Sequence, residues 1–402
     1  MKIVIVQAAI MLFQGLLSLI YAVLKIFPVK PGKVLFCSRQ SDEIPLDFLL
    51  LKNHLKEKKT DIEVIFICNR ISRDVRGCIS FFGSLLKSMY HLATSSVCII
   101  DSYWPAVSML THKKSLKVIQ IWHSIGKMKK SGYQALDRKS GRKSEYADLL
   151  KMHKNYDYLV GGSKFWNDDY CEAFGVDENQ ILNYGLPRID YLIDSQEENK
   201  RRFYAEFPEL REKKVVLYAP TFRKNMKSEW ANIMSAGTYD DIEIIVKNHP
   251  GQNAEKISTN TGVRYIDSWD TIDLLTVCDY LITDYSSIAF EAAVIRTKTY
   301  FWTYDYDEYM RNSGINIDLK NEMSGNLFKN LEELMQAIEY DRYNYEQQEA
   351  YIDKYLMDDI GYSTELITDF VINLIREEES KHEVCYHGRW KSNAMEETSR
   401  ST

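Results

Sequence analysis

Short apolar runs rich in β-branched residues alternate with longer stretches of helical period along most of this chain. Runs that are apolar almost throughout, rather than at every second residue, are typical of strands buried on both faces of a parallel sheet, and the stretches between them suit crossover helices. In the first half the predicted strands are Lys33–Cys37, Glu63–Cys68, Val97–Ile100, Lys117–Trp122, Tyr156–Val160 and Ile181–Tyr184. In the second half they are Val215–Ala219, Ile242–Lys247, Val263–Ile266, Tyr280–Thr283 and Thr299–Trp302. The sequence therefore predicts an α/β fold with two doubly wound, Rossmann-like halves.

The other segments give the expected domain limits. A chain of 402 residues is long enough for two domains of about 100–200 residues each. We place the N-terminal domain at 31–195 and the C-terminal domain at 212–377, with the charged segment Gln196–Lys214 as a connector. Residues 378–402 are polar and lack a period, so a disordered tail is predicted. Helices are predicted at Phe165–Phe174, Leu331–Gln348 and Gly361–Glu377.

The first thirty residues form a separate segment, which we expect to be a membrane-associated helix. Residues 3–24 carry no formal charge, and at about 1.5 Å per residue a helix of this length just crosses a hydrocarbon core of about 30 Å. Its polar side chains fall in one narrow stripe, which favours a helix lying in the bilayer surface or docked on protein; they are Gln7, Gln14, Ser18, Tyr21 and Lys25. The lysines that follow the run place its C-terminal side on the cytoplasmic face. An interfacial helix, a spanning helix and the buried helix of a soluble protein are the three alternatives.

Composition argues against several classes of protein. With a net charge of −6, binding to nucleic acid is not expected. Seven cysteines without a CxxC pair argue against a disulfide framework or a zinc ribbon. Asp305 and Asp307 form the D-x-D pattern of metal-dependent sugar transferases, but no other candidate ligand accompanies them. We therefore assign no metal site and expect no cofactor.

Two histidines directly follow predicted strands, and ligands of open α/β sheets bind at the carboxyl ends of strands. His123 precedes glycines and lysines, and a neutral imidazole there could take a proton from an attacking hydroxyl. The alternative is a histidine that only hydrogen-bonds its own loop. His249 lies in Lys247-Asn-His-Pro250, where the proline favours an extended backbone, although an ordinary turn explains the same residues.

A hydroxyl-rich turn follows the predicted strand Tyr280–Thr283 and precedes a helix. Free N–H groups at a helix start, together with hydroxyls, bind phosphate, and ordinary N-capping is the alternative. The candidates are Thr283, Asp284, Ser286 and Ser287, with Glu291 one turn into the helix, where it could face a ribose hydroxyl. Arg223, after another strand, could pair with a phosphate in bidentate fashion or lie in a surface turn.

Residues 127–154 form a basic run, with nine Lys or Arg against three acidic residues. A solvated helix face is the usual explanation for such a run. Because this one follows His123 in a chain with an apolar N-terminus, we also expect an anionic lipid surface or a lipid-diphosphate acceptor as its partner. Lys127, Lys129 and Lys130 are the candidate contacts.

Six motifs, taken in order, resemble the CDP-glycerol glycerophosphotransferase family, whose members build teichoic acids and related phosphate-linked polymers. They are WHSIGKMKKSG at 122–132, YGLPRIDYL at 184–192, YAPTFR at 218–223, KNHP at 247–250, ITDYSSIAFEAA at 282–293 and FWTYDYDEY at 301–309. The resemblance covers residues 30–320 or so, and the apolar N-terminus looks like the family's peripheral membrane anchor. The W-H-x-x-G-x-x-K-K-x-G form is similar to that of priming enzymes, which add one glycerol phosphate to a lipid-linked disaccharide.

The resemblance implies a two-domain fold of the glycosyltransferase-B type, with the donor in the C-terminal half and the acceptor over the N-terminal half. It implies transfer of glycerol phosphate from CDP-glycerol to a hydroxyl of a polyprenyl-diphosphate-linked saccharide or a growing polymer, with release of CMP, at the cytoplasmic face of the cell membrane. The alternatives are a ribitol-phosphate transferase that uses CDP-ribitol, a nucleotide-sugar epimerase of the same fold, and a non-catalytic membrane-peripheral binding protein.

The family's site residues can be carried over only where the motifs match. His123 resembles the base that deprotonates the acceptor hydroxyl, and His249 resembles the residue that contacts the donor diphosphate. Arg223 and Arg188 match positions that contact phosphate or form the wall of the site. Thr283, Ser286 and Ser287 match the phosphate-binding turn, and Glu291 matches a nucleotide ribose contact.

Overall fold

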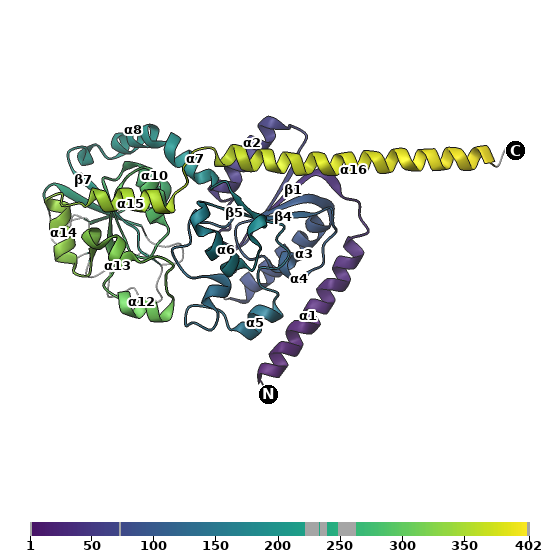
Figure 1. Ribbon diagram of the computed structural model, residues 1–402, viewed down its shortest axis with the longest axis horizontal. Coiled ribbons are helices and arrows are strands. Elements are labelled where there is room, and N and C mark those ends of the chain that lie inside the picture. The colour runs from purple at the N-terminus through teal and green to yellow at the C-terminus, as the bar shows by residue number, and fades with distance from the viewer. Residues whose placement is uncertain (1, 72–73, 222–232, 234–238, 248–262, 400–402) are drawn as a thin grey trace.

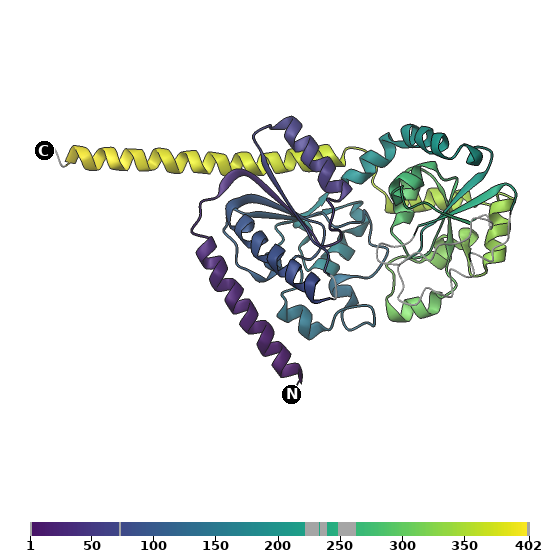
Figure 2. The same cartoon turned by 180° about the vertical axis from the view of Figure 1, so that it is seen from behind.

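The structure is a computed structural model that describes residues 2–71, 74–221, 233, 239–247 and 263–399. In this part of the chain two six-stranded sheets, each entirely parallel, form two lobes side by side (Figures 1 and 2). The predicted α/β class with two doubly wound sheets is therefore confirmed.

The first sheet has the strand order β2-β1-β3-β4-β5-β6. Val34 of β1 lies opposite Val64 of β2 and Val97 of β3, so β-branched residues pack side by side across the sheet. The order reverses between β1 and β3, and loops after such a pair of strands border a ligand crevice in α/β proteins. The strands are β1 (Lys30–Ser38), β2 (Glu63–Cys68), β3 (Ser95–Ile100), β4 (Lys117–Gln120), β5 (Tyr158–Gly161) and β6 (Ile181–Asn183).

The second sheet has the strand order β12-β11-β10-β7-β8-β9. Its order reverses between β7 and β10, so the loops after these two strands border the corresponding crevice of the second half. Two-residue β12 was not predicted. The strands are β7 (Lys214–Tyr218), β8 (Ile242–Val246), β9 (Val263–Tyr265), β10 (Tyr280–Thr283), β11 (Lys298–Trp302) and β12 (Leu327–Phe328).

Helices connect the strands. Those of the first half are α1 (Lys2–Leu24), α2 (Leu46–Lys58), α3 (Val75–Thr94), α4 (Pro105–Met109), α5 (Ser144–Leu149), α6 (Asn167–Phe174) and α7 (Pro187–Asp194). The later ones are α8 (Gln196–Glu206), α10 (Thr271–Val277), α11 (Ile288–Val294), α12 (Tyr306–Asn312), α13 (Leu319–Glu322), α14 (Leu331–Glu339), α15 (Tyr345–Tyr355) and α16 (Ser363–Ser399). The helix predicted at Leu331–Gln348 is two helices, because Asp341 adopts a φ of +49° and Asn344 caps the N-terminus of α15.

The charged segment predicted to be a connector is mostly helical and packs on the second sheet. Phe203 of α8 and Leu210 just after it are fully buried in one cluster with Val215 and Leu217 of β7. The sequence signal for this packing was weak, because Glu, Lys and Arg dominate the segment and only a few apolar residues face the core.

The segment predicted to be a disordered tail belongs to α16, which continues to Ser399 and projects from the body (Figure 1). The first turns of α16 lie on the first sheet, where Ile367, Val371 and Ile375 are buried. The chain thus returns to the N-terminal half after the second sheet is complete, instead of staying in a C-terminal domain that ends at residue 377. Beyond these apolar contacts Glu379 of α16 still pairs with Lys59, at 3.0 Å.

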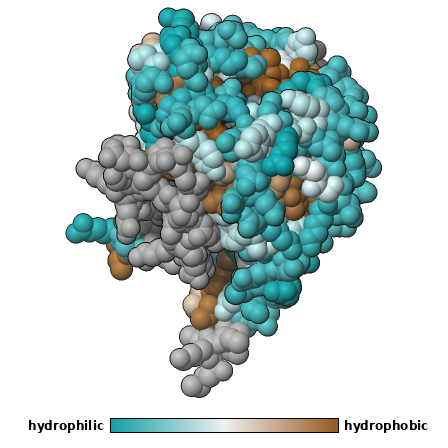
Figure 3. Space-filling model, turned by 90° about the vertical axis from the view of Figure 1, so that its left-hand side faces the viewer, coloured by the Kyte–Doolittle hydropathy of each residue, from teal (hydrophilic) through white to brown (hydrophobic). Residues whose placement is uncertain are grey.

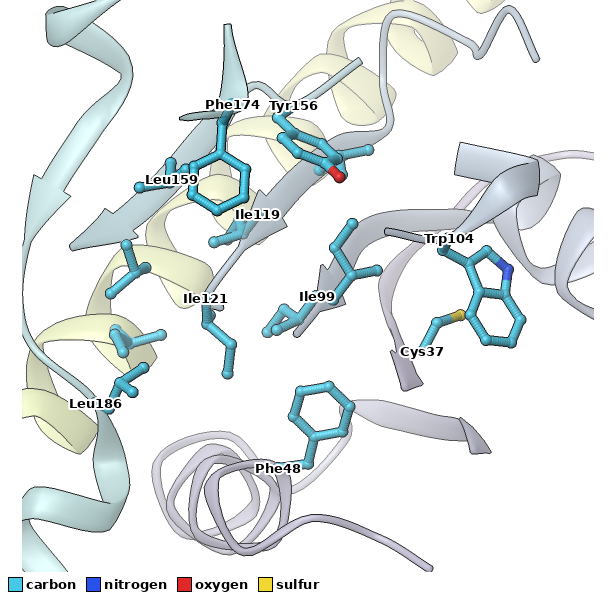
Figure 4. Packing of buried hydrophobic residues seen from close by; sticks show 14 of the residues in the cluster. Cys37, Phe48, Ile99, Trp104, Ile119, Ile121, Tyr156, Leu159, Phe174 and Leu186 are labelled. Atoms are coloured by element: carbon cyan, nitrogen blue, oxygen red, sulfur yellow. The ribbon is translucent and has the colours of Figure 1, made fainter. Parts of the chain in front are cut away.

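The largest hydrophobic core surrounds the first sheet and reaches into the second half. Figure 4 shows part of it, with strand residues such as Ile99 and Ile119 packed in one cluster with Phe48 of α2 and Phe174 of α6. The same cluster contains Phe290 of α11. The two halves therefore share buried apolar surface, which fixes the walls of the space between them.

A backbone connection also joins the two halves. The Lys130 amide donates to the Gly314 carbonyl at 3.2 Å, and the Asn316 amide donates to the Met128 carbonyl at 2.9 Å. The Asn316 side chain donates to the Lys127 carbonyl at 2.9 Å. The segment after His123 is consequently bound to the second half at several points.

Gly126 is a point of close approach in this contact, because a Cβ atom there would lie 2.6 Å from the Phe290 ring. We expect Gly126→Ala to lower the free energy of unfolding by about 1–3 kcal/mol, since the ring has to move in a packed core. Gly83 on α3 is a matched control, because nothing lies within 4 Å of the position that its Cβ would take; Gly83→Ala should leave stability unchanged or raise it slightly. Urea denaturation of both variants measures the difference, and equal stabilities would contradict this account.

Helix α1 docks on the first half through its polar stripe. The Gln14 side chain donates to the Leu149 carbonyl, and the Lys25 ammonium donates to the Thr111 carbonyl at 3.0 Å. The Tyr21 hydroxyl lies 2.8 Å from Nδ1 of His112. Val6–Leu24 has a mean hydropathy of 1.8 and is long and apolar enough to cross a membrane. Most of this segment lies outside the protein core.

Candidate active site

A cleft of about 650 Å³ lies between the two halves. This volume is within the range of small-molecule sites, about 300–1,000 Å³. The first half contributes His123 and the segment after it, and the second half contributes Thr221, Ser286 and Ser287. One of the two predicted histidines and part of the predicted hydroxyl-rich turn therefore face the same space, although they belong to different halves of the sequence.

His123 follows an unusual backbone conformation at the end of β4. Trp122 has a φ of +57°, which is a strained conformation for a bulky residue. Its amide donates to the Gln120 side-chain oxygen at 2.9 Å, and this bond holds the turn. The indole ring lies against the His123 imidazole with centroids 4.0 Å apart, and Phe174 packs on the same indole with centroids 4.9 Å apart.

The contact with the Asp101 carbonyl favours one tautomer of His123. Nδ1 lies 3.2 Å from the Asp101 carbonyl oxygen, which can only accept, so Nδ1 carries the proton and Nε2 is the basic nitrogen. The Gln40 side-chain nitrogen, which can only donate, lies 3.3 Å from the same Nδ1 and makes no hydrogen bond to it in this tautomer. Burial lowers the pKa of His123 to about 4, and the nearby cations Arg188 and Lys127 lower it further against the effect of the Asp101 carbonyl. The imidazole is therefore neutral at pH 7, as a general base must be.

The predicted lysines also reach the cleft. Lys127, Lys129 and Lys130 all line it. Lys127 is only 2% exposed, and its ammonium lies 5.2 Å from the Trp122 ring centroid and 4.9 Å from that of Phe174. Burial lowers the pKa of Lys127 to about 7, with Asp169 acting in the opposite direction.

The hydroxyl-rich turn divides into residues that face the cleft and residues that brace it. Ser286 and Ser287 line the cleft. Thr283 is fully buried, and its hydroxyl donates to the Ala219 carbonyl at 2.8 Å. Asp284 is 2% exposed, and its carboxylate accepts from the Thr221 amide at 2.9 Å. These two side chains hold the loops after β7 and β10 together at the switch point of the sheet.

Two predicted residues lie outside the cleft wall. The guanidinium of Arg188 on α7 pairs with Asp47 on α2, with Nε 2.8 Å from Oδ2, and neither Arg188 nor Glu291 is among the described residues that line the cleft. Glu291 on α11 is 3% exposed, and its Oε2 has no hydrogen-bond partner among the residues described. Burial raises the pKa of Glu291 to about 7, and the charge of Arg188 opposes this shift.

The remaining candidates fall partly outside the described chain. Arg223 and His249 lie outside the described residues, so their positions relative to the cleft stay predictions. Asp305 accepts from the Tyr285 hydroxyl at 3.1 Å, and Asp307 pairs with Lys320 at 3.2 Å. The two carboxylates of the D-x-D pattern thus have separate partners.

The structure adds cleft residues that sequence reasoning missed. Arg39, Tyr103, Arg142 and His153 all line the cleft. Arg39 directly follows β1, and Tyr103 comes three residues after β3. These are the two strands that flank the switch point of the first sheet, so the rule that directed attention to His123 could have found both residues.

Comparisons with known proteins agree on the family. The family model described as CDP-Glycerol:Poly(glycerophosphate) glycerophosphotransferase matches residues 19–373. A teichoic acid ribitol-phosphate primase of Bacillus spizizenii is 28% identical over 376 residues, which are 90% of this chain and 96% of the relative. A teichoic acid glycerol-phosphate primase of Bacillus subtilis is 30% identical over 303 residues, covering 72% of this chain and 77% of the relative.

A solved structure supports the fold. The wall teichoic acid polymerase TagF superposes with a TM-score of 0.73 at 19% identity, over 93% of this chain and 99% of that one. The two parallel sheets, the apolar N-terminal helix and this likeness confirm the expected glycosyltransferase-B type of fold. Relatives of this chain include teichoic acid primases and polymerases for both glycerol phosphate and ribitol phosphate. Because the family model covers most of the chain, the protein belongs to the CDP-glycerol:poly(glycerophosphate) glycerophosphotransferase family.

Proposed function

We propose that this protein transfers glycerol phosphate from CDP-glycerol to a hydroxyl of a lipid-linked saccharide or growing polymer and releases CMP. The acceptor is a polyprenyl-diphosphate-linked saccharide of teichoic acid or a related cell-surface polymer, met at the cytoplasmic face of the membrane. The observation that carries the proposal is the shared cleft of about 650 Å³, which has His123 on one wall and Ser286 and Ser287 on the other.

The chemistry follows from these two walls. The acceptor hydroxyl attacks the phosphorus that bears the glycerol, and its proton passes to Nε2 of His123, the nitrogen that the Asp101 contact leaves basic. The bond between that phosphorus and the CMP oxygen breaks, so CMP carries away the bonding electron pair. Catalysis of such a step depends mainly on positioning and on contacts to the phosphate oxygens. Ser286 and Ser287 are placed to supply hydroxyl donors, and Lys127, Lys129 and Lys130 positive charge.

The second wall is held in place by residues that the donor need not touch. Asp284 binds the loop after β7, and Thr283 binds the Ala219 carbonyl. We infer that these two residues position Ser286 and Ser287, while Arg223, His249 and Glu291 are kept as candidate donor contacts on the sequence patterns and the family motifs.

CDP-ribitol is the second candidate donor. It is favoured by the ribitol-phosphate primase of Bacillus spizizenii, whose alignment covers 96% of that relative. The decisive experiment supplies the purified protein with each CDP-polyol and a synthetic lipid-diphosphate disaccharide, and then measures CMP release and product mass. We expect CMP with CDP-glycerol and a product heavier by one or more glycerol phosphate units. Turnover of CDP-ribitol but not of CDP-glycerol would make CDP-ribitol the donor. Absence of CMP release from both compounds would refute the proposal.

We also propose that α1 lies on the membrane surface with its apolar side toward the lipid. The exposed residues of its outer side include Leu12 at 76%, Leu16 at 53% and Leu19 at 67%. Neighbouring α3 adds Val75 and Ile79, which are 75% and 66% exposed. By contrast, the end of the molecule formed by the second half is largely hydrophilic (Figure 3).

Replacing Leu12, Leu16 and Leu19 together by glutamine is expected to weaken binding to vesicles by about 1,000-fold or more, because each buried leucine contributes about 1.5–3 kcal/mol. Co-sedimentation with vesicles of phosphatidylglycerol measures the change. A triple glutamine variant at Tyr340, Tyr362 and Leu366, which are exposed in the second half and at the start of α16, is the control and should bind like the wild type. Unchanged binding of the leucine variant would argue against this surface.

A further inference from the structure

Two arginines meet at one tyrosine on the N-terminal wall of the cleft. The guanidinium carbon of Arg39 lies 5.4 Å from the Tyr103 ring centroid, and that of Arg142 lies 5.3 Å from the same centroid. All three residues line the cleft. Like charges held this close repel each other, and the proximity of Arg142 lowers the pKa of Arg39 in addition to the larger effect of burial.

Within the described part of the chain, neither Arg39 nor Arg142 forms an ion pair with a carboxylate. Nη1 of Arg142 is buried without a hydrogen-bond partner among the same residues. Asp101, a buried acid whose charge acts on Arg39, is occupied by other donors, since it accepts from Ser38 at 2.6 Å and from Ser102 at 2.8 Å. Partly buried cations in a cleft that have no carboxylate partner are costly, and they are candidates for binding an anionic ligand.

The surrounding residues hold the backbone at both arginines in position. The Arg142 carbonyl accepts from the Asp137 amide at 2.9 Å, and a Cβ at Gly141 would lie 1.6 Å from the Ala135 carbonyl oxygen. The Arg39 amide donates to the Ser102 hydroxyl at 3.3 Å. The Tyr103 hydroxyl donates to the Leu150 carbonyl at 2.8 Å, which holds the ring that both arginines approach.

We propose that Arg39 and Arg142 form a subsite for a phosphate ester carried by the acceptor, next to the hydroxyl that is deprotonated. This inference rests on the proposed function. Its position follows from the chain, because Gln40, the neighbour of Arg39, lies 3.3 Å from His123. Paired guanidinium groups match the oxygens of a phosphate. The subsite belongs to the N-terminal half, whereas Ser286 and Ser287 belong to the other wall. The acceptor class is therefore a saccharide or polymer whose terminal polyol is already linked to phosphate.

The test compares two synthetic acceptors with the same lipid diphosphate and disaccharide. One ends in a sugar hydroxyl and the other in one glycerol phosphate. For the wild type we expect a lower KM for the phosphate-ended acceptor. Arg39→Gln and Arg142→Gln should each raise that KM about 10- to 100-fold. The KM for the acceptor that ends in a sugar hydroxyl and the affinity for CDP-glycerol should stay unchanged. Arg201→Gln removes a charge from an exposed residue of α8 that is not among the residues lining the cleft and should behave as the wild type.

Each other outcome has a defined meaning. An equal rise in KM for both acceptors would assign the arginines to the lipid diphosphate that the acceptors share. Weaker binding of CDP-glycerol would assign them to the donor. Either result overturns the proposal, and so would unchanged KM values. Binding of glycerol 3-phosphate, measured by calorimetry, does not need turnover. If the wild type binds glycerol 3-phosphate and Arg142→Gln does not, the phosphate subsite is supported even when no CDP-polyol is turned over. Failure of the subsite proposal can therefore be distinguished from failure of the proposed function.

Discussion

Replacement of His123 by alanine is expected to reduce the transfer of polyol phosphate by about 10²–10⁴-fold, the usual contribution of a general base. Nδ1 of this imidazole lies 3.2 Å from the Asp101 carbonyl oxygen, which leaves Nε2 as the nitrogen that takes the proton of the acceptor hydroxyl in the proposed reaction. The ring lies beside Trp122 and is not part of the buried core. Its loss should therefore remove the base and leave the fold intact.

The pH dependence of the rate provides a second test of the same residue. Burial lowers the pKa of His123 to about 4. A base acts in its unprotonated form, which predominates above that pKa, so His123 should cause loss of activity only as the pH falls through about 4. Between about pH 8 and 6 its protonation should not limit the rate, in contrast to an unperturbed histidine, which would do so near pH 6.5.

The measurement is CMP release from the CDP-polyol in the presence of acceptor, together with the melting temperature and the affinity for the donor. His54 of α2 lies away from the cleft, so His54→Ala is the matched control and should retain the wild-type rate. A His123→Ala variant that released CMP at the wild-type rate would exclude a catalytic role for this imidazole.

Local sequence patterns were sufficient to predict the sheets. Each predicted run overlaps an observed strand, because buried parallel strands are nearly continuous apolar segments. The pattern failed where local composition and tertiary packing disagree. Phe203 and Leu210 are too sparse among charged residues to reveal that α8 joins a core, and no local pattern shows that the first turns of α16 return to the first sheet. Two-residue β12 is too short to leave a pattern at all.

The candidate site was predictable from two local patterns. His123, Ser286 and Ser287 directly follow strands, Lys127, Lys129 and Lys130 belong to the basic run, and the structure brings all six to one cleft. Arg188 was assigned from a motif, and its position outside the cleft wall depends on a partner far away in the sequence. The acceptor of Arg188, Asp47, is 141 residues distant, and no single-sequence pattern reports such a pair.

Arg188→Met is expected to lower the free energy of unfolding by about 3–5 kcal/mol, because removal of one member of a buried ion pair leaves the other charge uncompensated. The side chain of Asp47 is 3% exposed and that of Arg188 is 21% exposed. Asp47 also accepts from the backbone amide of Arg188 at 2.8 Å, so its carboxylate cannot turn away to solvent. The positive charge of Arg188 also favours the ionised form of Glu291. Because Glu291 belongs to α11, Arg188 interacts electrostatically with the second half as well as with Asp47.

Urea denaturation of single and double variants distinguishes this account from a simple loss of packing. Asp47→Asn should cost less than Arg188→Met, since the amide oxygen still accepts from the Arg188 backbone and Glu291 can ionise to balance the remaining cation. Adding Asp47→Asn to Arg188→Met should then recover part of the loss, because no unpaired carboxylate is left at position 47. Arg201 is the control: its pair with Glu198 on α8 is 74% and 54% exposed, and Arg201→Met should change stability by less than about 1 kcal/mol. If the Arg188 and Arg201 variants were equally stable, or if the double variant were weaker by the full sum of the two single losses, charge compensation across α2, α7 and α11 would not be what holds this part of the protein together.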